Sequence, residues 1–261
     1  MGNELKGRTA LVTGASSGIG ADFARELAAQ GCHLVLVARR AEALEALARE
    51  LRDGGIKVSV MPADLSAGAT REQLLRDVEA AGLQVDVLVN NAGFGVFGDF
   101  ADTAWARLDQ MLQLDVVGLT HLTHLFVPAM IGRGYGRILQ VGSTGAFQPS
   151  PGYAAYAAAK SYVLNFGIAL NHELKDKGVS CTVLNPGVTA TEFFAVSGQK
   201  FTWYQRSTVM QPRVVAGIGV RAMATRKPSV VAGFLNKMMA FSTRLSPRPM
   251  TAAIAHELMK N

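Results

Sequence analysis

The sequence predicts an α/β fold with a single domain, in which a doubly wound parallel sheet has helices on both faces. Short apolar runs alternate with segments of helical periodicity along the 261 residues. An apolar share of 49% and a mean hydropathy of +0.19 fit strands that are buried on both faces. Short polar or glycine-rich motifs directly follow the apolar runs, at the edge where the carboxyl ends of parallel strands meet.

The alternation begins with a βαβ unit of about thirty residues. A buried strand is expected over 8–13, a helix over 18–30 and a second strand over 33–38. The same patterns predict the later elements: helix 41–52, strand 57–62, helix 70–81, strand 85–89, helix 105–131, strand 136–142, helix 153–177 and strand 179–184. No Pro/Gly/Ser-rich linker and no repeat of fixed period interrupts the series, so one domain is expected.

The turn after the first strand carries three glycines within seven residues, in the pattern Thr13-Gly14-x-x-x-Gly18-x-Gly20. Glycine lets the backbone adopt positive φ and lets a ligand approach closely. The helix that follows directs its unpaired N–H groups and the positive end of its dipole at the same place. The turn therefore predicts a phosphate site, and a merely tight turn is the alternative.

A second motif is Tyr156-x-x-x-Lys160, which places a phenol and an ammonium on one face of a helix. The pair is common by chance in helices, but Ser143 stands thirteen residues before Tyr156, at the end of a predicted strand. A phenol with a pKa of ~10 needs a nearby cation to exchange protons near neutral pH, and Lys160 can supply that cation. These three side chains are the candidate proton-transfer group.

Both motifs resemble those of the short-chain dehydrogenase/reductase family, and the resemblance spans about residues 8–191. It implies a Rossmann-like sheet and hydride transfer between a nicotinamide and a carbonyl or alcohol carbon. Tyr156 is then the general acid/base, Ser143 binds the substrate oxygen, and Lys160 binds the nicotinamide ribose and lowers the Tyr156 pKa. The cofactor-binding residues implied are Gly14, Ser16, Ser17, Gly18, Ile19, Gly20, Asp64, Leu65, Asn91, Ala92, Gly93, Tyr156, Lys160, Pro186, Gly187, Val188, Thr189 and Thr191.

One position departs from the family pattern. Asp115 stands where the family usually has an asparagine whose backbone holds a water linking the lysine to solvent. A carboxylate leaves the backbone carbonyl in place, but it can also pair with Lys160 and weaken its effect on Tyr156. We expect a retained but slower proton relay, with Asp115 as part of the catalytic group.

The end of the second strand predicts the cofactor. An acidic residue there binds the ribose 2′-OH of NAD, whereas arginine suits the 2′-phosphate of NADP(H). The chain has Arg39 and Arg40 and no carboxylate at this place, so NADP(H) is expected, with Arg39 as the main contact and Arg40 near the adenine. The alternative is that both arginines are solvated residues at the start of a helix. In the glycine turn, Ser17 stands where some NADP-using relatives carry a second basic residue.

Residues 190–225 correspond to the lid over the substrate in the family, and they contain Phe193, Phe194, Phe201, Trp203 and Tyr204. These rings predict a bulky apolar small-molecule substrate, with ordinary packing as the alternative. Four other aromatic residues are expected to extend the pocket: Phe94, Phe97, Phe147 and Tyr153. Tyr153 is a poorer acid/base candidate than Tyr156, because no lysine follows it at the fourth position.

The net charge of +6 comes from scattered residues, which argues against a nucleic-acid binder. No cluster of metal-ligand residues accompanies His121 or His124, so no metal is expected. Cys32 and Cys181 adjoin apolar runs and are expected to be buried thiols of a cytoplasmic protein. The C-terminal extension 230–261 is expected to be a packed helix or subunit contact, or to lie on a membrane surface.

The family resemblance further implies a homodimer or homotetramer formed through the helices 105–131 and 153–177. Two other function classes stay open from the sequence. One is an NADP-binding regulatory or scaffolding protein without turnover, for which Asp115 is the best support. The other is an isomerase, dehydratase or epimerase on the same fold.

Overall fold

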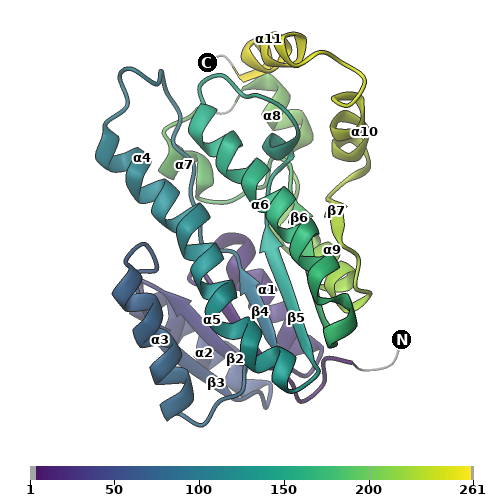
Figure 1. The fold of residues 1–261 in the computed structure, drawn as a ribbon. Helices are drawn as coiled ribbons and strands as arrows, with labels where there is room; N and C mark the ends of the chain where they lie inside the picture. Colours follow the sequence, from purple (N-terminus) through teal and green to yellow (C-terminus); the bar gives the residue numbers. More distant parts are fainter. Residues whose placement is uncertain (1–3, 201, 260–261) are drawn as a thin grey trace.

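Seven parallel strands form one sheet in the part of the chain that a computed structural model describes, residues 4–200 and 202–259 (Figure 1). The strands lie in the order β3-β2-β1-β4-β5-β6-β7, so the winding direction reverses between β1 and β4. Their bounds are β1 Thr9–Thr13, β2 His33–Ala38, β3 Val58–Pro62, β4 Val87–Asn90, β5 Gly136–Val141, β6 Val179–Asn185 and β7 Ser229–Val231. The predicted doubly wound sheet is confirmed.

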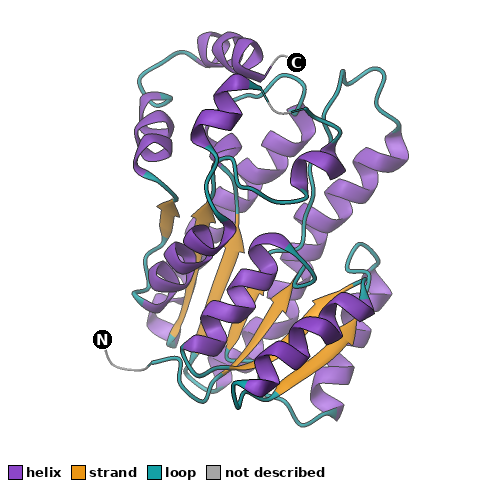
Figure 2. Ribbon diagram, turned by 180° about the vertical axis from the view of Figure 1, so that it is seen from behind, coloured by secondary structure: helices purple, strands orange, loops and turns teal. Residues whose placement is uncertain are grey.

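Three helices cover each face of the sheet (Figures 1 and 2). One core cluster joins the sheet to α1 (Gly18–Ala29), α2 (Ala41–Asp53) and α9 (Pro212–Ala224). The other core cluster joins it to the helices of the opposite face: α3 (Gly68–Ala80), α5 (Leu119–Gly132) and α6 (Ala154–Leu174).

The alternation of side chains along β2 shows how one strand contributes to both cores. Leu34 and Leu36 belong to the first cluster, whereas Val35 and Val37 belong to the second. Successive side chains of a strand point to opposite faces, so a strand covered on both faces is apolar throughout. This is why the sequence shows continuous apolar runs instead of polar and apolar residues in alternation.

The predicted helix 105–131 is wrong in one respect, because it is not a continuous α-helix. It consists of α4 (Trp105–Leu112), a π-helical turn η1 (Gln113–Gly118) and α5. A π-helical turn accommodates an extra residue and is frequent at functional sites. Here it contains the buried Asp115, which is described below.

The segment from α4 to the end of α5 is also long and apolar enough to cross a membrane, by length and composition alone. Its side chains nevertheless serve the core of this domain. Leu122, Phe126 and Met130 of α5 are buried against the sheet in the second core cluster. We therefore interpret this segment as a core helix.

Two segments follow β6: residues 190–225, expected to be a substrate lid, and the C-terminal extension. The first contains α7 (Phe193–Ser197), α8 (Trp203–Thr208) and α9, and the C-terminal extension contains α10 (Phe234–Ser242) and α11 (Arg248–Met259). Two 3₁₀ turns, η2 (Thr144–Phe147) and η3 (Lys175–Lys177), flank α6. The edge strand β7 was not predicted, because its three half-buried residues give too short an apolar run.

Candidate active site

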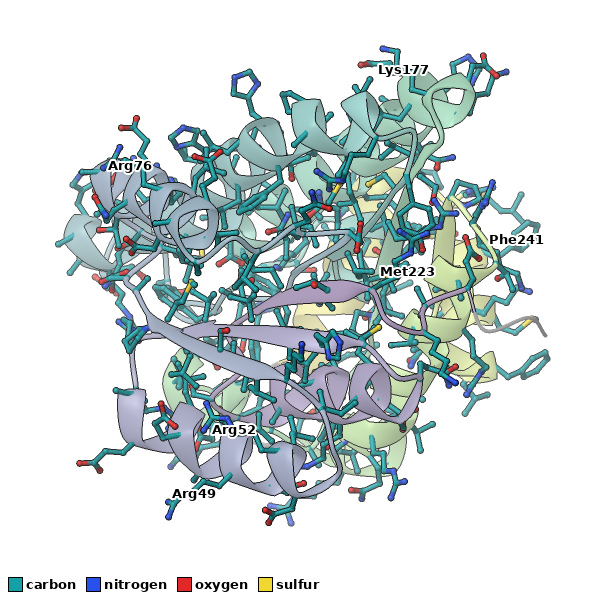
Figure 3. The ribbon with its side chains drawn as sticks, turned by 90° about the horizontal axis from the view of Figure 1, so that it is seen from below. Arg49, Arg52, Arg76, Lys177, Met223 and Phe241 are labelled. Atoms are coloured by element: carbon teal, nitrogen blue, oxygen red, sulfur yellow. The ribbon has the colours of Figure 1, made fainter. Side chains whose placement is uncertain are left out.

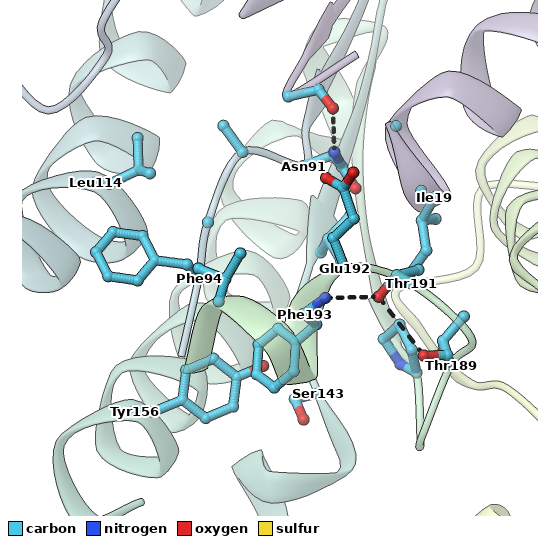
Figure 4. A pocket seen from close by; sticks show the side chains of 18 of the residues that line it. Ile19, Asn91, Phe94, Leu114, Ser143, Tyr156, Thr189, Thr191, Glu192 and Phe193 are labelled. Atoms are coloured by element: carbon cyan, nitrogen blue, oxygen red, sulfur yellow. Dashed lines mark hydrogen bonds between the residues drawn. The ribbon is translucent and has the colours of Figure 1, made fainter. Parts of the chain in front are cut away.

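A cleft of about 470 Å³ opens at the carboxyl edge of the sheet (Figure 4). Every predicted cofactor-binding residue lines it, including Arg39 and Arg40, and so do Ser143, Tyr156 and Lys160. Asp115 does not line the cleft and lies behind Lys160. The sheet therefore brings these motifs together, although they come from positions up to 177 residues apart.

The glycines of the first turn are required by close backbone packing. Gly14 has φ +65°, and a Cβ there would lie 2.8 Å from Nδ2 of Asn91. A Cβ on Gly20 would overlap the carbonyl oxygen of Gly14. Any side chain at these two positions would displace the turn from the end of α1 and partly close the cleft.

The N-terminus of α1 is prepared for an anion. Its N-cap, Ser17, makes no side-chain hydrogen bond to the first turn, and this turn contains no acidic residue. The first N–H groups of the helix thus keep their hydrogen-bonding capacity, and the positive end of the dipole is not neutralised from within the helix. This arrangement suits a pyrophosphate.

The ends of β1 and β4 are fastened to each other by Thr13. Its Oγ1 accepts hydrogen bonds from the backbone N–H groups of Asn91 and Ala92, both at 2.9 Å, and donates to the carbonyl of Val89. The side-chain amide of Asn91 in turn donates to the carbonyl of Thr13 at 2.9 Å. These bonds fix the crevice where the winding direction of the sheet reverses, which is the usual ligand position in such folds.

Ser143, Tyr156 and Lys160 form the chemical centre of the cleft. Ser143 caps η2, where its Oγ accepts a hydrogen bond from the N–H of Gly145 at 3.1 Å. Tyr156 and Lys160 extend from one face of α6, and Nζ of Lys160 lies 5.6 Å from the centre of the Tyr156 ring. The ammonium is buried and donates to the carbonyl of Val141 at 3.1 Å.

Asp115 forms an ion pair with Lys160, in which Oδ2 lies 3.0 Å from Nζ. The carboxylate is 0% exposed, and its Oδ1 accepts a hydrogen bond from the N–H of Phe94 at 3.0 Å. Gly93 leaves room for it, because a Cβ there would lie 2.8 Å from Oδ1. Of the two arrangements expected for Asp115, the structure shows the pairing with Lys160.

This pairing changes the electrostatics expected at Tyr156. Burial raises the pKa of the Tyr156 phenol, the Lys160 cation lowers it, the Asp115 carboxylate raises it and a hydrogen bond with Ser143 lowers it. Lys160 thus acts on the Tyr156 pKa in the expected direction, but burial and Asp115 outweigh it, and the net result is a raised pKa. Burial lowers the pKa of Lys160, but Asp115 and Tyr156 outweigh it, so the pKa is raised and the lysine stays charged.

The two arginines at the end of β2 differ in their contacts. Arg40 pairs with Glu192 at 3.0 Å and donates to Oγ of Ser17 at 2.7 Å, while its place near an adenine stays a prediction. Ser17 also donates to Glu192 at 2.9 Å. Arg39 is exposed on the cleft wall. Burial raises the pKa of the neighbouring Asp64, but two hydrogen bonds from Ser66 and, to a smaller extent, the charge of Arg39 lower it, and the net result is a lowered pKa.

Aromatic side chains form the substrate end of the cleft. The Tyr156 ring lies 5.4 Å from Phe193 and 5.6 Å from Tyr153, centre to centre. Phe94 and Phe194 line the cleft as expected, whereas Phe97 packs behind Tyr153 at 5.0 Å. Phe147 is not among the lining residues, which corrects its expected place. Phe201 and the side chains of Trp203 and Tyr204 lie outside what the structure describes.

Tyr153 has different hydrogen-bond partners from Tyr156. Its hydroxyl lies 3.0 Å from Oγ of Ser197 and 3.0 Å from Oε1 of Gln199, within hydrogen-bond distance of both, and so ties the start of α6 to the end of α7 and the segment after it. Burial raises the pKa of Tyr153 to about 12. It therefore remains protonated and hydrogen-bonded at neutral pH, in agreement with the sequence argument for Tyr156.

The structure adds lining residues that the sequence argument did not identify, namely Arg107, Glu192, Gln199, Gln205 and Met259. Glu192 directly follows the motif that ends at Thr191, so its position was the available indication. Met259 reaches the cleft from the end of α11, where its carbonyl accepts a hydrogen bond from Gln199 at 3.0 Å. Nothing in the local sequence indicates such a distant contact.

Metal-ligand residues do not gather in the described residues, where no group of three or more His, Cys, Asp or Glu side chains is suitably placed. His121 instead accepts a hydrogen bond from Arg71 at 3.1 Å. Cys32 and Cys181 are free and buried, as expected.

Comparisons with known proteins agree with this architecture. A family model described as short chain dehydrogenase matches residues 8–201. A short-chain dehydrogenase from Sphingobium yanoikuyae in complex with NADPH is 30% identical, with a TM-score of 0.82, and the match covers 91% of this chain and 93% of that one. A short-chain dehydrogenase/reductase from Burkholderia phymatum in complex with NAD is 27% identical, with a TM-score of 0.82 and 93% of both chains covered.

A third solved structure is the bulky-bulky ketone specific alcohol dehydrogenase from Comamonas testosteroni, 27% identical with a TM-score of 0.77, over 91% of this chain and 93% of that one. Among curated proteins, the glycine betaine reductase ATRR of Emericella nidulans is 33% identical over 87% of this chain, which spans only 18% of that protein. With the family model covering most of its length, the chain belongs to the short-chain dehydrogenase/reductase family of nucleotide-binding oxidoreductases.

Proposed function

We propose that this protein is an NADP(H)-dependent oxidoreductase that interconverts a carbonyl and a secondary alcohol, with Tyr156 as general acid/base. The observation that carries the proposal is the convergence of Ser143, Tyr156 and Lys160 on one cleft with the glycine turn. A phenol held beside a buried cation, next to a site for a dinucleotide, suits proton transfer coupled to hydride transfer.

The residues present fit a dinucleotide. The N-terminus of α1, whose own first turn contains no acidic residue, suits the pyrophosphate, and Gly14 and Gly20 allow close approach of the backbone. We assign the 2′-phosphate of NADP(H) to Arg39, because it is exposed on the cleft wall and makes no ion pair within the described residues. One solved relative holds NADPH and another NAD, so the preference itself is a proposal.

NADPH, when bound, supplies the hydride for reduction. Tyr156 then donates its phenolic proton to the substrate oxygen, and its raised pKa keeps that proton in place at neutral pH. Ser143 accepts from Gly145 through its oxygen, so its own hydrogen, which can bond Tyr156, is also available to the substrate oxygen. Lys160, fixed by Val141 and Asp115, stabilises the phenolate that remains.

The substrate is proposed to be a bulky apolar ketone or the corresponding alcohol. The reacting end of the cleft is enclosed by the rings of Phe94, Tyr153 and Phe193, which favour apolar surface. The printed description of the Comamonas testosteroni relative as specific for bulky-bulky ketones supports this class.

The test is spectrophotometric consumption of NADPH with a panel of bulky, small, aromatic and aliphatic ketones, repeated with NADH. We expect turnover of bulky apolar ketones, a higher kcat/KM with NADPH, and loss of turnover in Ser143→Ala and Tyr156→Phe. A product formed without net oxidation of NADPH would instead indicate an isomerase or dehydratase.

A second candidate is an NADP-binding protein without turnover, which the Asp115–Lys160 ion pair favours because it offsets the charge that activates Tyr156. Tight NADPH binding together with absent turnover across the panel would support it. We further propose a homodimer or homotetramer formed through α6 and the segment α4–η1–α5, where Tyr162 and Ile168 of α6 and Val117 of η1 are exposed. Light scattering during gel filtration measures this state directly.

A further inference from the structure

The helix α10 and the turn after it present large apolar side chains to solvent. Phe234 is 76% exposed, Leu235 65%, Phe241 56% and Leu245 77%. Seen from below, Figure 3 places Phe241 at the rim of the molecule, on the side opposite Arg49 and Arg76. We define the C-terminal surface as these residues with their neighbours: Phe234, Leu235, Lys237, Met238, Phe241, Arg244, Leu245 and Arg248.

The large apolar side chains of α10 point outward, whereas those of an ordinary surface helix point toward the core. Its buried residues are Asn236 and Ala240, which are small or polar. Phe234, Met238 and Phe241 recur at intervals of four and three residues, and so share the opposite face. A helix that packs only within its own domain buries its large apolar residues. The exposed apolar face of α10 is therefore suited to contact apolar material outside the domain.

The charges around this face have one sign. Residues 193–256 contain nine Lys or Arg residues and no Asp or Glu. Lys237, Arg244 and Arg248 flank the apolar face, and none of them forms an ion pair within residues 4–200 and 202–259. Apolar residues interspersed with unpaired cations are typical of helices that lie in the interface of an anionic membrane.

The same charges disfavour a second copy of the chain as the occupant. In a two-fold symmetric contact the same patch meets itself, so Lys237, Arg244 and Arg248 would approach their own counterparts. The absence of any carboxylate from 193 to 256 leaves no partner for them within the patch. Like charges brought together in this way oppose association.

We propose that the C-terminal surface docks on an anionic lipid bilayer, with Phe234, Leu235 and Phe241 inserted among the acyl chains and the three cations at the phosphate groups. The domain then lies on the membrane without spanning it. This inference does not depend on the reaction catalysed.

Cosedimentation tests it with vesicles of phosphatidylglycerol and phosphatidylcholine in equal parts, and with vesicles of phosphatidylcholine alone. We expect the full chain to bind the anionic vesicles more strongly, and added salt to weaken this binding. Replacing two exposed phenylalanines, in Phe234→Gln with Phe241→Gln, should weaken binding by at least about tenfold. The matched control replaces two equally exposed aromatic residues elsewhere, in Phe100→Gln with Trp105→Gln, and should bind as the parent does.

A second pair of variants keeps the test independent of the phenylalanines. Arg244→Gln with Arg248→Gln should reduce binding to anionic vesicles, whereas Arg49→Gln on the far side should not. Absence of parent binding to anionic vesicles, or equal binding of the phenylalanine variant, would overturn the proposal. The proposal would also be overturned if the parent did not bind vesicles and were a dimer, whereas the phenylalanine variant were a monomer. The surface would then be a subunit contact.

Discussion

The exchange Asp115→Asn probes the electrostatic control of Tyr156. Nζ of Lys160 lies 5.6 Å from the Tyr156 ring centre, which corresponds to about 3 kcal/mol of phenolate stabilisation at an effective dielectric constant of about 20. Oδ2 of Asp115 lies 3.0 Å from that ammonium. Its distance from the ring centre is therefore at most the sum of the two distances, about 8.6 Å. At that distance it opposes the phenolate by about 2 kcal/mol.

Removing the carboxylate should therefore lower the pKa of Tyr156 and make the phenolate available at lower pH. Alcohol oxidation needs the phenolate, so its kcat/KM on the acidic side of the profile should rise by at least about tenfold. Ketone reduction needs the phenol, which both proteins hold at neutral pH, so the reductive rate should change little there.

The assay is the pH profile of alcohol oxidation and of ketone reduction for the parent and Asp115→Asn, followed through NADPH absorbance. The exchange Asp102→Asn removes an exposed carboxylate and serves as the matched control. An oxidative profile that does not move to lower pH in Asp115→Asn would refute the electrostatic reasoning. Thermal unfolding of each variant checks that the fold is retained.

Three further predictions concern the cofactor site and the thiols. Gly20→Ala should abolish NADPH binding in a fluorescence titration, because its Cβ overlaps the Gly14 carbonyl oxygen; parental affinity would show that the turn tolerates a side chain. Arg39→Asp should lower kcat/KM with NADPH at least about tenfold and spare NADH, and an equal loss with both would remove Arg39 from the 2′-phosphate. Burial raises the pKa of Cys32 and Cys181 to about 12, so iodoacetamide should label both only after unfolding, and rapid labelling of the native protein would contradict their burial.

The sequence was sufficient to predict most of the fold, because buried parallel strands leave a simple pattern. Continuous apolar runs such as His33–Ala38 arise from burial on both faces, and the glycines at the end of β1 arise from the close packing of Gly14 and Gly20. The carboxyl ends of parallel strands lie at one edge of a sheet. Because the motifs directly follow the strands, the sequence also predicted that these motifs meet in one cleft.

The features that were missed depend on tertiary contacts without a local pattern. The π-helical turn contains Asp115, which pairs with Lys160, and periodicity alone does not distinguish this turn from an α-helix. Glu192 becomes a partner of Arg40 only when the chain after β6 returns over the glycine turn. For the C-terminal extension the sequence left packing and a membrane surface both open, and the outward face of α10 became evident from its buried side, which holds Asn236 and Ala240.

Proton transfer by Tyr156 is the central claim, and the rate of NADPH oxidation by Tyr156→Phe tests it most directly. With a ketone that the parent reduces, the account predicts that this variant still binds NADPH but, with NADPH at saturation, turns over at least about a hundredfold more slowly. A variant that oxidises NADPH as fast as the parent would contradict the account.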